Sequence, residues 1–180
     1  MPKEQGASAA GVIGALRRAK LSHFVTVPDF VQLALHLAIE RGDSGLSLVR
    51  TANEDQAVCT AAGLTVAGKR PVIAVQNQGF YACVNTVRAV ALDARIPCFF
   101  LIGQFGRETS NFGAASTQSR RRVVNLLEPM LNTLGVPFWS LDSDDDLSLV
   151  EQALDAADSR RGPAALIVNR PLAWSREVAQ

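Results

Sequence analysis

The sequence of 180 residues is poor in the side chains that build disulfide frameworks and metal sites. It has three cysteines, Cys59, Cys83 and Cys98, which form no C-x-x-C pair. An odd number of widely spaced cysteines argues against a disulfide framework or a zinc site. The two histidines, His23 and His36, are too few for a metal cluster. We therefore expect a protein of a reducing compartment without a metal site of its own.

Charge of one sign and long apolar runs are also missing. With 18 basic and 17 acidic residues the net charge is +1, which argues against a nucleic-acid or membrane surface built on bulk charge. The longest apolar stretch, residues 96–103, has the length of a strand and not the ~20 residues of a membrane span. Residues 1–10 lack the apolar run of a signal peptide. We expect a cytoplasmic protein whose low charged fraction, 19%, hints at a protein partner.

Three common catalytic signatures are absent as well. No G-x-x-x-x-G-K-[ST] loop occurs, and no G-x-G-x-x-G follows the first apolar strand. The serines lack a G-x-S-x-G setting. Phosphate-loop, dinucleotide and serine-hydrolase chemistry therefore find no support in the sequence.

What the sequence does have is a regular alternation of short apolar runs and helical periods. The apolar runs at residues 23–27, 46–50, 71–75, 98–102, 136–141 and 164–168 predict six strands buried on both faces. Helices are predicted over residues 8–20, 29–41, 53–67, from the 76–80 turn to before Pro97, over 120–134, and from the 142–146 acidic run to about 162. We place Phe30, Leu33 and Leu37 on the inward face of the second helix. The pattern predicts a three-layer α/β/α domain with a six-stranded parallel sheet over residues 8–174, with tails at 1–7 and 175–180.

Polar segments follow the first four predicted strands. They are Pro28-Asp29, residues 51–54, residues 76–79 and residues 103–118. The turns at the other ends of the strands hold no comparable candidate site residues. Because ligands of parallel α/β sheets gather at the carboxyl ends of the strands, we expect the functional site at this edge. The long polar stretch of residues 103–119 is of a kind that usually carries function or is disordered.

Glu54 has two interpretations. Thr51-x-x-Glu54 matches a capping box, and on spacing alone this is the favoured interpretation. The alternative is a carboxyl group in apolar surroundings that shares a proton with a ligand nitrogen. Gly79 permits a tight turn and a close backbone approach to a ligand, and Asn77 suits either a helix cap or a ligand contact.

Together these segments resemble the pyrimidine-binding (PYR) domain of thiamine-diphosphate (ThDP) enzymes. The similarity is greatest to the alpha subunit of sulfopyruvate decarboxylase and to the N-terminal part of phosphonopyruvate decarboxylase. It rests on VPD at 27–29, on ANEDQAVCTAAGLTVAGKRPVIAVQNQG at 52–79 and on Asn85, and it covers about residues 10–170.

The resemblance implies a ThDP-binding fold of PYR type and a ThDP-dependent 2-oxo acid decarboxylase. In that family the glutamate at the position of Glu54 hydrogen-bonds N1′ of the aminopyrimidine and favours its imino tautomer. The 4′ nitrogen then removes the thiazolium C2 proton, and the ylide attacks the 2-oxo acid. The resemblance thus assigns Glu54 as catalytic. Its implied cofactor contacts are Pro28, Asp29, Glu54, Asn77, Gly79 and Asn85.

The chain departs from the family at positions that bear on the substrate. Phe30 replaces the serine of V-P-D-S, and Gln78 replaces the serine of Q-N-S-G. Gly103-Gln104 is similar to acetolactate synthase and benzoylformate decarboxylase, and Gln118 is similar to a glutamine of the acetolactate synthase loop. Gln104, Arg107 and Gln118 are candidate substrate contacts, with Arg107 a possible partner of an anionic group. The identity of the 2-oxo acid stays open.

The diphosphate-binding (PP) half of such an enzyme has no counterpart in this chain. Its signature is G-D-G followed by an asparagine, which hold Mg²⁺ on the diphosphate. The nearest string, at residues 42–44, precedes the second strand and lies at the wrong end of the sheet. The resemblance therefore implies a separate PP-domain beta subunit that holds Mg²⁺ and shares ThDP with this chain. On this interpretation the chain is an alpha subunit, active only with that partner, and the isolated chain is a candidate homo-oligomer.

Two alternatives stay open at this point. One is a carboligase similar to acetolactate synthase, indicated by Gly103-Gln104. The other is a non-catalytic flavodoxin-like binding or regulatory module, which would be a stable monomer with an uncovered sheet edge.

Overall fold

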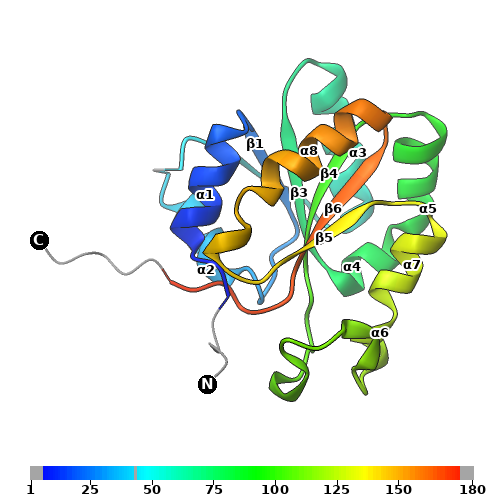
Figure 1. The fold of residues 1–180 in the computed structure, drawn as a ribbon. Helices are drawn as coiled ribbons and strands as arrows, with labels where there is room; N and C mark the ends of the chain where they lie inside the picture. Colours follow the sequence, from blue (N-terminus) through cyan, green and yellow to red (C-terminus); the bar gives the residue numbers. More distant parts are fainter. Residues whose placement is uncertain (1–5, 43, 175–180) are drawn as a thin grey trace, which may run out of the picture.

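Six parallel strands form one sheet in the computed structural model, which describes residues 6–42 and 44–174 (Figure 1). The strand order is β2-β1-β3-β4-β6-β5. The strands are β1 (His23–Thr26), β2 (Ser47–Arg50), β3 (Pro71–Gln76), β4 (Cys98–Gly103), β5 (Phe138–Leu141) and β6 (Pro163–Val168). All six predicted strands are present, so the predicted parallel α/β sheet is confirmed.

Helices cover both faces of this sheet. On one face lie α1 (Ala9–Arg18), α2 (Leu33–Glu40) and α8 (Leu149–Arg160). On the other lie α3 (Glu54–Val66), α4 (Asn77–Ala82), α5 (Val84–Thr86), the π-helix η1 (Val87–Asp93) and α7 (Leu127–Thr133). The remaining short elements are α6 (Arg122–Asn125) and the 3₁₀ turns η2 (Thr109–Asn111), η3 (Ser116–Gln118) and η4 (Asp144–Asp146). Among the described residues, no helix is long and apolar enough to cross a membrane.

Two apolar cores follow from the two-residue period of the strands. Along β4, Phe99 and Leu101 belong to the core beneath α1, α2 and α8, whereas Phe100 and Ile102 belong to the core beneath α3, α4 and α7. Because successive side chains of a strand point to opposite faces, an unbroken apolar run serves both layers. This explains the apolar central strands β4 and β6, which are buried along their whole length. The prediction of burial on both faces is wrong for the edge strands β2 and β5, which are partly exposed and contain Ser47, Arg50 and Ser140.

The start of α2 differs from the prediction. A helix was expected from Asp29, but α2 begins at Leu33. The Asp29 carboxylate accepts a hydrogen bond from the Val31 N–H, and this local turn competes with helical pairing. The expected inward face is therefore wrong. Phe30 is 65% exposed and Leu33 38% exposed, and Leu37 is only half-buried.

Two further helices are broken into pieces. The single helix expected before Pro97 consists of α4, α5 and η1. The helix expected over residues 120–134 consists of α6, which ends at Asn125, and α7. Pro129 accounts for the second break, because proline has no N–H and its ring crowds the carbonyl four residues earlier, that of Asn125.

The described chain is packed from Gly6 onward. The Gly6 N–H donates to the Pro171 carbonyl, and the Ala173 N–H donates to the Ala7 carbonyl. Ala7 is fully buried. Assigning these two residues to an N-terminal tail is therefore wrong, whereas residues 1–5 and 175–180 of the predicted tails lie outside the described residues. Ser8 does cap α1 as predicted, because its Oγ accepts the Gly11 N–H at 3.0 Å.

Removal of the Phe100 ring should test the core beneath α3 and α4. Phe100 is fully buried and meets Phe80 edge to face, with 5.6 Å between ring centroids. We expect Phe100→Ala to lower the free energy of unfolding by about 3–5 kcal/mol, measured by urea denaturation. The control Phe30→Ala removes an exposed ring and should change it by less than about 1 kcal/mol. Equal losses in the two variants would contradict this core.

Candidate functional site

The sheet changes its direction of winding between β1 and β3. After β1 the chain continues to β2 on one side, and β3 and β4 then follow on the other. The helices after β1 and β3, α2 and α4, cover opposite faces of the sheet (Figure 1). In α/β proteins, the carboxyl ends of the two strands at such a switch point form the usual ligand-binding crevice. Asp29 follows β1 and Asn77 follows β3, so both lie at this crevice.

The hydrogen bonds that cap α3 do not involve the Glu54 side chain. Asn53 is the N-cap, and its Oδ1 accepts the Gln56 N–H at 2.9 Å. In return, the Gln56 Oε1 accepts a hydrogen bond from the Ala52 N–H at 3.1 Å. Thr51 instead donates its hydroxyl to the Thr26 and Asn53 carbonyls. The Thr51–Glu54 capping box is therefore wrong, because the reciprocal pair is Asn53–Gln56 and Glu54 is the first residue of the helix.

The Glu54 carboxylate is available at the crevice. The side chain is half-buried, and within the described residues no hydrogen bond or ion pair to its carboxylate is found. It lies against Gly79 of α4, where an added Cβ would overlap the Glu54 carboxyl group. Gly79 thus makes the room that Glu54 occupies. The N-terminus of α3 favours the negative charge.

A second carboxyl group, that of Asp29, is held in a buried network. Its Oδ1 accepts the Val31 N–H at 2.8 Å, and its Oδ2 accepts the Gln32 Nε2–H at 2.7 Å. The Asp29 N–H donates to His36 Nε2 at 3.1 Å. A Cβ added at Gly103 would overlap Asp29 Oδ2, so a glycine makes room here too.

Burial sets the ionisation of this network. It raises the pKa of Asp29 to about 6, although hydrogen bonds from Gln32, Val31 and Gln76 act in the opposite direction. Burial also lowers the pKa of His36 to about 4, so the ring is neutral near pH 7 and accepts the Asp29 N–H. The Asp29 carboxyl therefore exchanges its proton closer to neutral pH than an exposed aspartate does.

The two carboxyl groups approach the same edge from opposite faces of the sheet. Position 103 continues the alternation of Phe99 and Leu101, which lie on the face covered by α1, α2 and α8, and Asp29 fills the space that Gly103 leaves. Glu54 instead contacts Gly79 on the α3–α4 face. Pro28, which precedes Asp29 in the sequence, is exposed. Asp29 is 2% exposed and both of its carboxyl oxygens accept hydrogen bonds within the chain, so of the two groups it is Glu54 that has acceptor capacity to offer a ligand.

Two other predicted cofactor contacts are engaged elsewhere. Asn77 is fully buried, and its amide hydrogens go to the Phe105 and Val123 carbonyls at 3.1 and 2.7 Å. It joins the start of α4 to the long loop. Asn85 is exposed on α5, and its Oδ1 accepts two hydrogen bonds from the Arg88 guanidinium. Neither side chain has a hydrogen bond to Glu54 or Asp29 in the described chain.

Arg107 organises the loop after β4. Its Nη1 donates to Gln104 Oε1 at 2.8 Å and to Asn169 Oδ1 at 2.6 Å. Nε and Nη2 donate to Asn111 Oδ1, to the Asn111 carbonyl and to the Ala114 carbonyl. All five N–H groups are therefore used within the protein, and burial lowers the pKa of the guanidinium. The structure gives no support to a contact between Arg107 and an anionic substrate.

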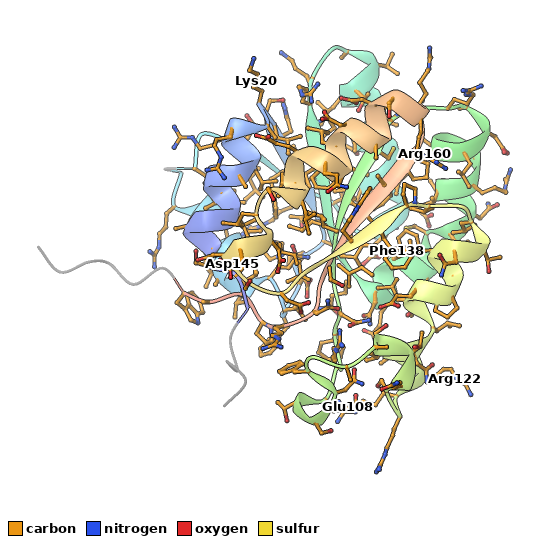
Figure 2. All side chains as sticks on the ribbon, in the orientation of Figure 1. Lys20, Glu108, Arg122, Phe138, Asp145 and Arg160 are labelled. Atoms are coloured by element: carbon orange, nitrogen blue, oxygen red, sulfur yellow. The ribbon has the colours of Figure 1, made fainter. Side chains whose placement is uncertain are left out.

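The other two candidate substrate residues, Gln104 and Gln118, differ in their exposure to solvent. Gln104 is 1% exposed and serves as an acceptor for Arg107. Gln118 is exposed on the wall of an open hollow of about 660 Å³, together with Glu108, Ser110 and Arg121. Figure 2 shows Glu108 at this end of the molecule and Lys20 and Arg160 at the opposite end.

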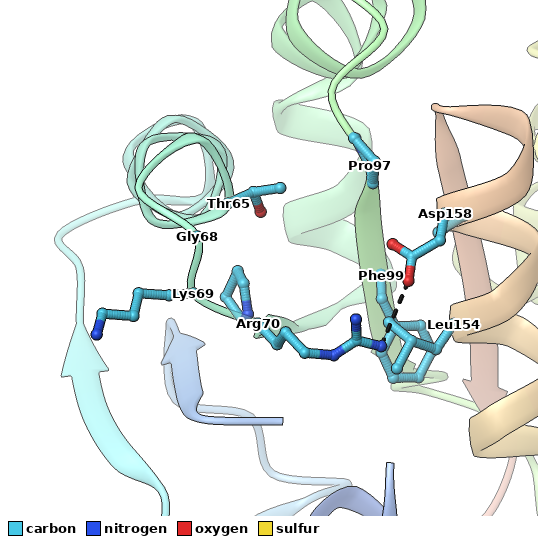
Figure 3. Close-up of a pocket in the computed structure, with 10 residues that line it drawn as sticks. Thr65, Gly68, Lys69, Arg70, Pro97, Phe99, Leu154 and Asp158 are labelled. Atoms are coloured by element: carbon cyan, nitrogen blue, oxygen red, sulfur yellow. Dashed lines mark ion pairs between the residues drawn. The ribbon is translucent and has the colours of Figure 1, made fainter. Parts of the chain in front are cut away.

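A second hollow, of about 290 Å³, lies at the wrong end of the sheet for the predicted site. It lies at the amino ends of two strands, because its border includes Pro71, the first residue of β3, and Pro97, the residue before β4 (Figure 3). Its Arg70 pairs with Asp158 at 3.3 Å. It contains none of the predicted site residues. In the described part of the chain, no group of three or more histidine, cysteine, aspartate or glutamate side chains is placed to hold a metal ion.

Comparison with known proteins establishes the fold. No protein-family profile and no curated protein matches the chain. A similar solved structure is the 2-oxoglutarate:ferredoxin oxidoreductase from Magnetococcus marinus, with 2-oxoglutarate, coenzyme A and succinyl-CoA bound. The TM-score is 0.66 at 16% sequence identity over 93% of this chain, which spans 29% of the length of that chain. At this identity the likeness concerns the fold alone, and it agrees with the three-layer α/β/α architecture expected from the sequence.

Sequence reasoning assigned no role to Gln32, and for Gly103 it found a resemblance but not its contact with Asp29. Gln32 lies three residues after Asp29, and this spacing is the signal that could have indicated their contact. The role of Gly103 as a space for Asp29 has no signal in the sequence, because the two residues meet only through the pairing of distant strands.

The Asp29 network predicts a pH dependence of stability. The folded-state pKa of about 6 lies above the usual 3.8, so the contribution of Asp29 is fully present below pH 3.8 and is lost as the pH rises through 6. Asp29→Asn removes this titration. From about pH 4 to pH 7 we expect the variant to gain roughly 2 kcal/mol relative to wild type, measured by urea denaturation. A stability difference that is constant over this range would contradict the buried carboxyl.

Proposed function

We propose that this chain is the PYR-type alpha subunit of a ThDP-dependent 2-oxo acid decarboxylase similar to sulfopyruvate and phosphonopyruvate decarboxylases. The observation that carries the proposal is the Glu54 carboxylate, which has no partner in the described chain and lies at the switch-point crevice. The fold shared with an oxidoreductase that holds a 2-oxo acid supports this class of substrate.

The residues at the crevice fit an aminopyrimidine ring. A protonated ring nitrogen requires an acceptor, and the Glu54 carboxylate can supply one without breaking an existing hydrogen bond. Gly79 keeps the backbone of α4 close to this side chain. ThDP, when bound, would supply the electron sink that decarboxylation of a 2-oxo acid needs.

Other predicted residues would shape the site. Pro28 and Asp29 would line it from the end of β1, while Asn77 and Arg107 would hold α4 and the long loop in place through their hydrogen bonds. Gln104 belongs to the same network, so its role here is structural and it does not favour a carboligase over a decarboxylase. Gln118 remains the candidate substrate contact on the open side.

The site needs a second subunit on this proposal. The sequence lacks the G-D-G string of a PP domain, and its nearest string, at residues 42–44, precedes β2 in the sequence, whereas Glu54 follows β2. A separate cytoplasmic beta subunit would hold the diphosphate through Mg²⁺. The chain spans only 29% of the oxidoreductase chain that it resembles in fold, which is compatible with such a division.

Replacement of Glu54 tests the carboxylate. We expect Glu54→Gln to lower kcat of the assembled enzyme at least 10²-fold, because an amide cannot share a proton with the ring nitrogen as a carboxylate does. The stability of the fold should be unchanged, since the Asn53–Gln56 pair caps α3. The neighbouring Asp55→Asn is a matched control that should keep activity. Wild-type turnover by Glu54→Gln would sink the assignment.

Division of the cofactor site gives another test. By titration calorimetry we expect the isolated chain to bind ThDP and Mg²⁺ weakly or not at all, because it supplies only the aminopyrimidine half. Co-expression with the product of a neighbouring gene that encodes a G-D-G string should restore binding and turnover in a panel of 2-oxo acids. Tight binding by the chain alone would refute the split site. Formation of a 2-hydroxy ketone from pyruvate and an aldehyde would favour a carboligase.

A further inference from the structure

We propose that the hollow bordered by Arg95, Arg160 and Arg161 is a binding site for an oligophosphate group, that is, for two or more linked phosphates. The hollow lies at the amino edge of the sheet, because its border includes Pro163, the first residue of β6. Glu54 follows the carboxyl end of β2, so the two places are at opposite edges of the sheet. This site lies outside the proposed function and does not depend on it.

Three helices end at this hollow, which is open and has a volume of about 540 Å³. Gly135 follows the C-cap of α7, Arg95 follows the C-cap of η1, and Arg161 is itself the C-cap of α8. The half-buried Leu92 and the buried Pro163 add apolar surface to its wall. Among the described residues that border the hollow there is no aspartate or glutamate.

The guanidinium groups of Arg95 and Arg161 are available to a ligand. Both side chains are exposed, and in the described part of the chain neither makes a hydrogen bond or an ion pair. Arg160 donates from Nη2 to the Gly135 carbonyl at 3.1 Å, which joins the end of α8 to the end of α7. The hollow therefore has two uncommitted guanidinium groups and a third that is held in place at its border.

No carboxylate in the described chain balances this charge. Asp93 and Asp158 are each two residues from one of the three arginines, but they pair with Arg88 and Arg70. The carboxyl end of a helix carries about −0.5 charge at most, so three such ends offset about half of the three positive charges. Interaction with the helix ends thus leaves roughly 1.5 positive charges in one hollow.

The backbone at Arg95 and Arg161 favours glycine. Their φ angles are 57° and 50°, in the left-handed region. Helices commonly end on a glycine in this conformation, because the Cβ of any other residue crowds the following carbonyl oxygen. Gly135 does so after α7, with a φ of 67°. Ending the helices therefore does not require arginine at positions 95 and 161, and what these residues add is two guanidinium groups.

An oligophosphate matches this arrangement. A guanidinium group donates two parallel N–H groups to the oxygen atoms of one phosphate, and linked phosphates present such oxygens to neighbouring guanidinium groups at the same time. The hollow has room for more than a single phosphate, and Leu92 and Pro163 leave an apolar wall beside the charges. The phosphates can belong to a nucleotide or to an inorganic oligophosphate.

Titration calorimetry of the full chain with tripolyphosphate tests the site without any activity. In buffer without divalent cations we expect saturable binding of one ligand per chain. Arg95→Gln and Arg161→Gln should each raise Kd by about 10-fold or more, because each removes charge-assisted hydrogen bonds. Arg122→Gln is the matched control, because it removes the same charge from an exposed arginine of α6 and should leave Kd unchanged. No binding by the wild type, or an equal loss in the control, would overturn the proposal.

A glycine variant separates binding from folding. Arg161→Gly should weaken binding as much as Arg161→Gln, while its free energy of unfolding in urea should not fall, because glycine adopts the left-handed conformation without strain. Tripolyphosphate binding by Arg161→Gly with the wild-type Kd would overturn the proposal.

Two further ligands identify the group that is recognised. ATP contains the same three linked phosphates, so tighter binding of ATP than of tripolyphosphate would assign a nucleotide, and equal binding an inorganic oligophosphate. A penta-glutamate peptide has negative charge but no phosphate, and it should bind more weakly than either. Peptide binding as tight as that of tripolyphosphate would overturn the phosphate assignment and favour an acidic protein segment.

Discussion

Burial of both faces of the parallel sheet is the constraint on which the rest of this molecule depends. Because helices cover each face, the central strands β4 and β6 are buried and apolar along their whole length, and the polar candidate residues lie after the ends of the strands. The reversal of winding between β1 and β3 means that the loops after these two strands lead to opposite faces of the sheet. They separate at one position along its carboxyl edge. The acidic side chains of interest, Glu54 and Asp29, both lie there.

Hydrogen-bond satisfaction separates the polar residues of this edge into two kinds. Asn77 and Arg107 use their donors entirely within the protein and hold the loop after β4 against α4 and β6. Glu54 has no such commitment in the described chain. Since a buried polar group usually has a partner, while a ligand-binding group must keep capacity free, the contrast distinguishes scaffold from site more sharply than residue type does.

The architecture could be predicted from the sequence because it depends on local patterns. Apolar runs, caps such as Ser8 and the position of polar segments after strands are visible in one dimension. The predictions that failed concern the starts of α2 and α3, which are decided by competition between local hydrogen bonds. The turn closed by Asp29 delays α2, and Asn53 replaces Thr51 as the cap of α3. The pairing of Glu54 with Gly79 and of Asp29 with Gly103 could not be derived, because it arises only when separate strands and helices meet.

The cap of α3 has a consequence for how this protein can change over evolutionary time. The side chains of Asn53 and Gln56, on either side of position 54, make the hydrogen bonds that cap the helix. The side chain at position 54 takes no part in them. On the proposed function, capping and catalysis would be carried by different side chains within four consecutive residues. Position 54 could then change its residue without loss of the hydrogen bonds that start the helix.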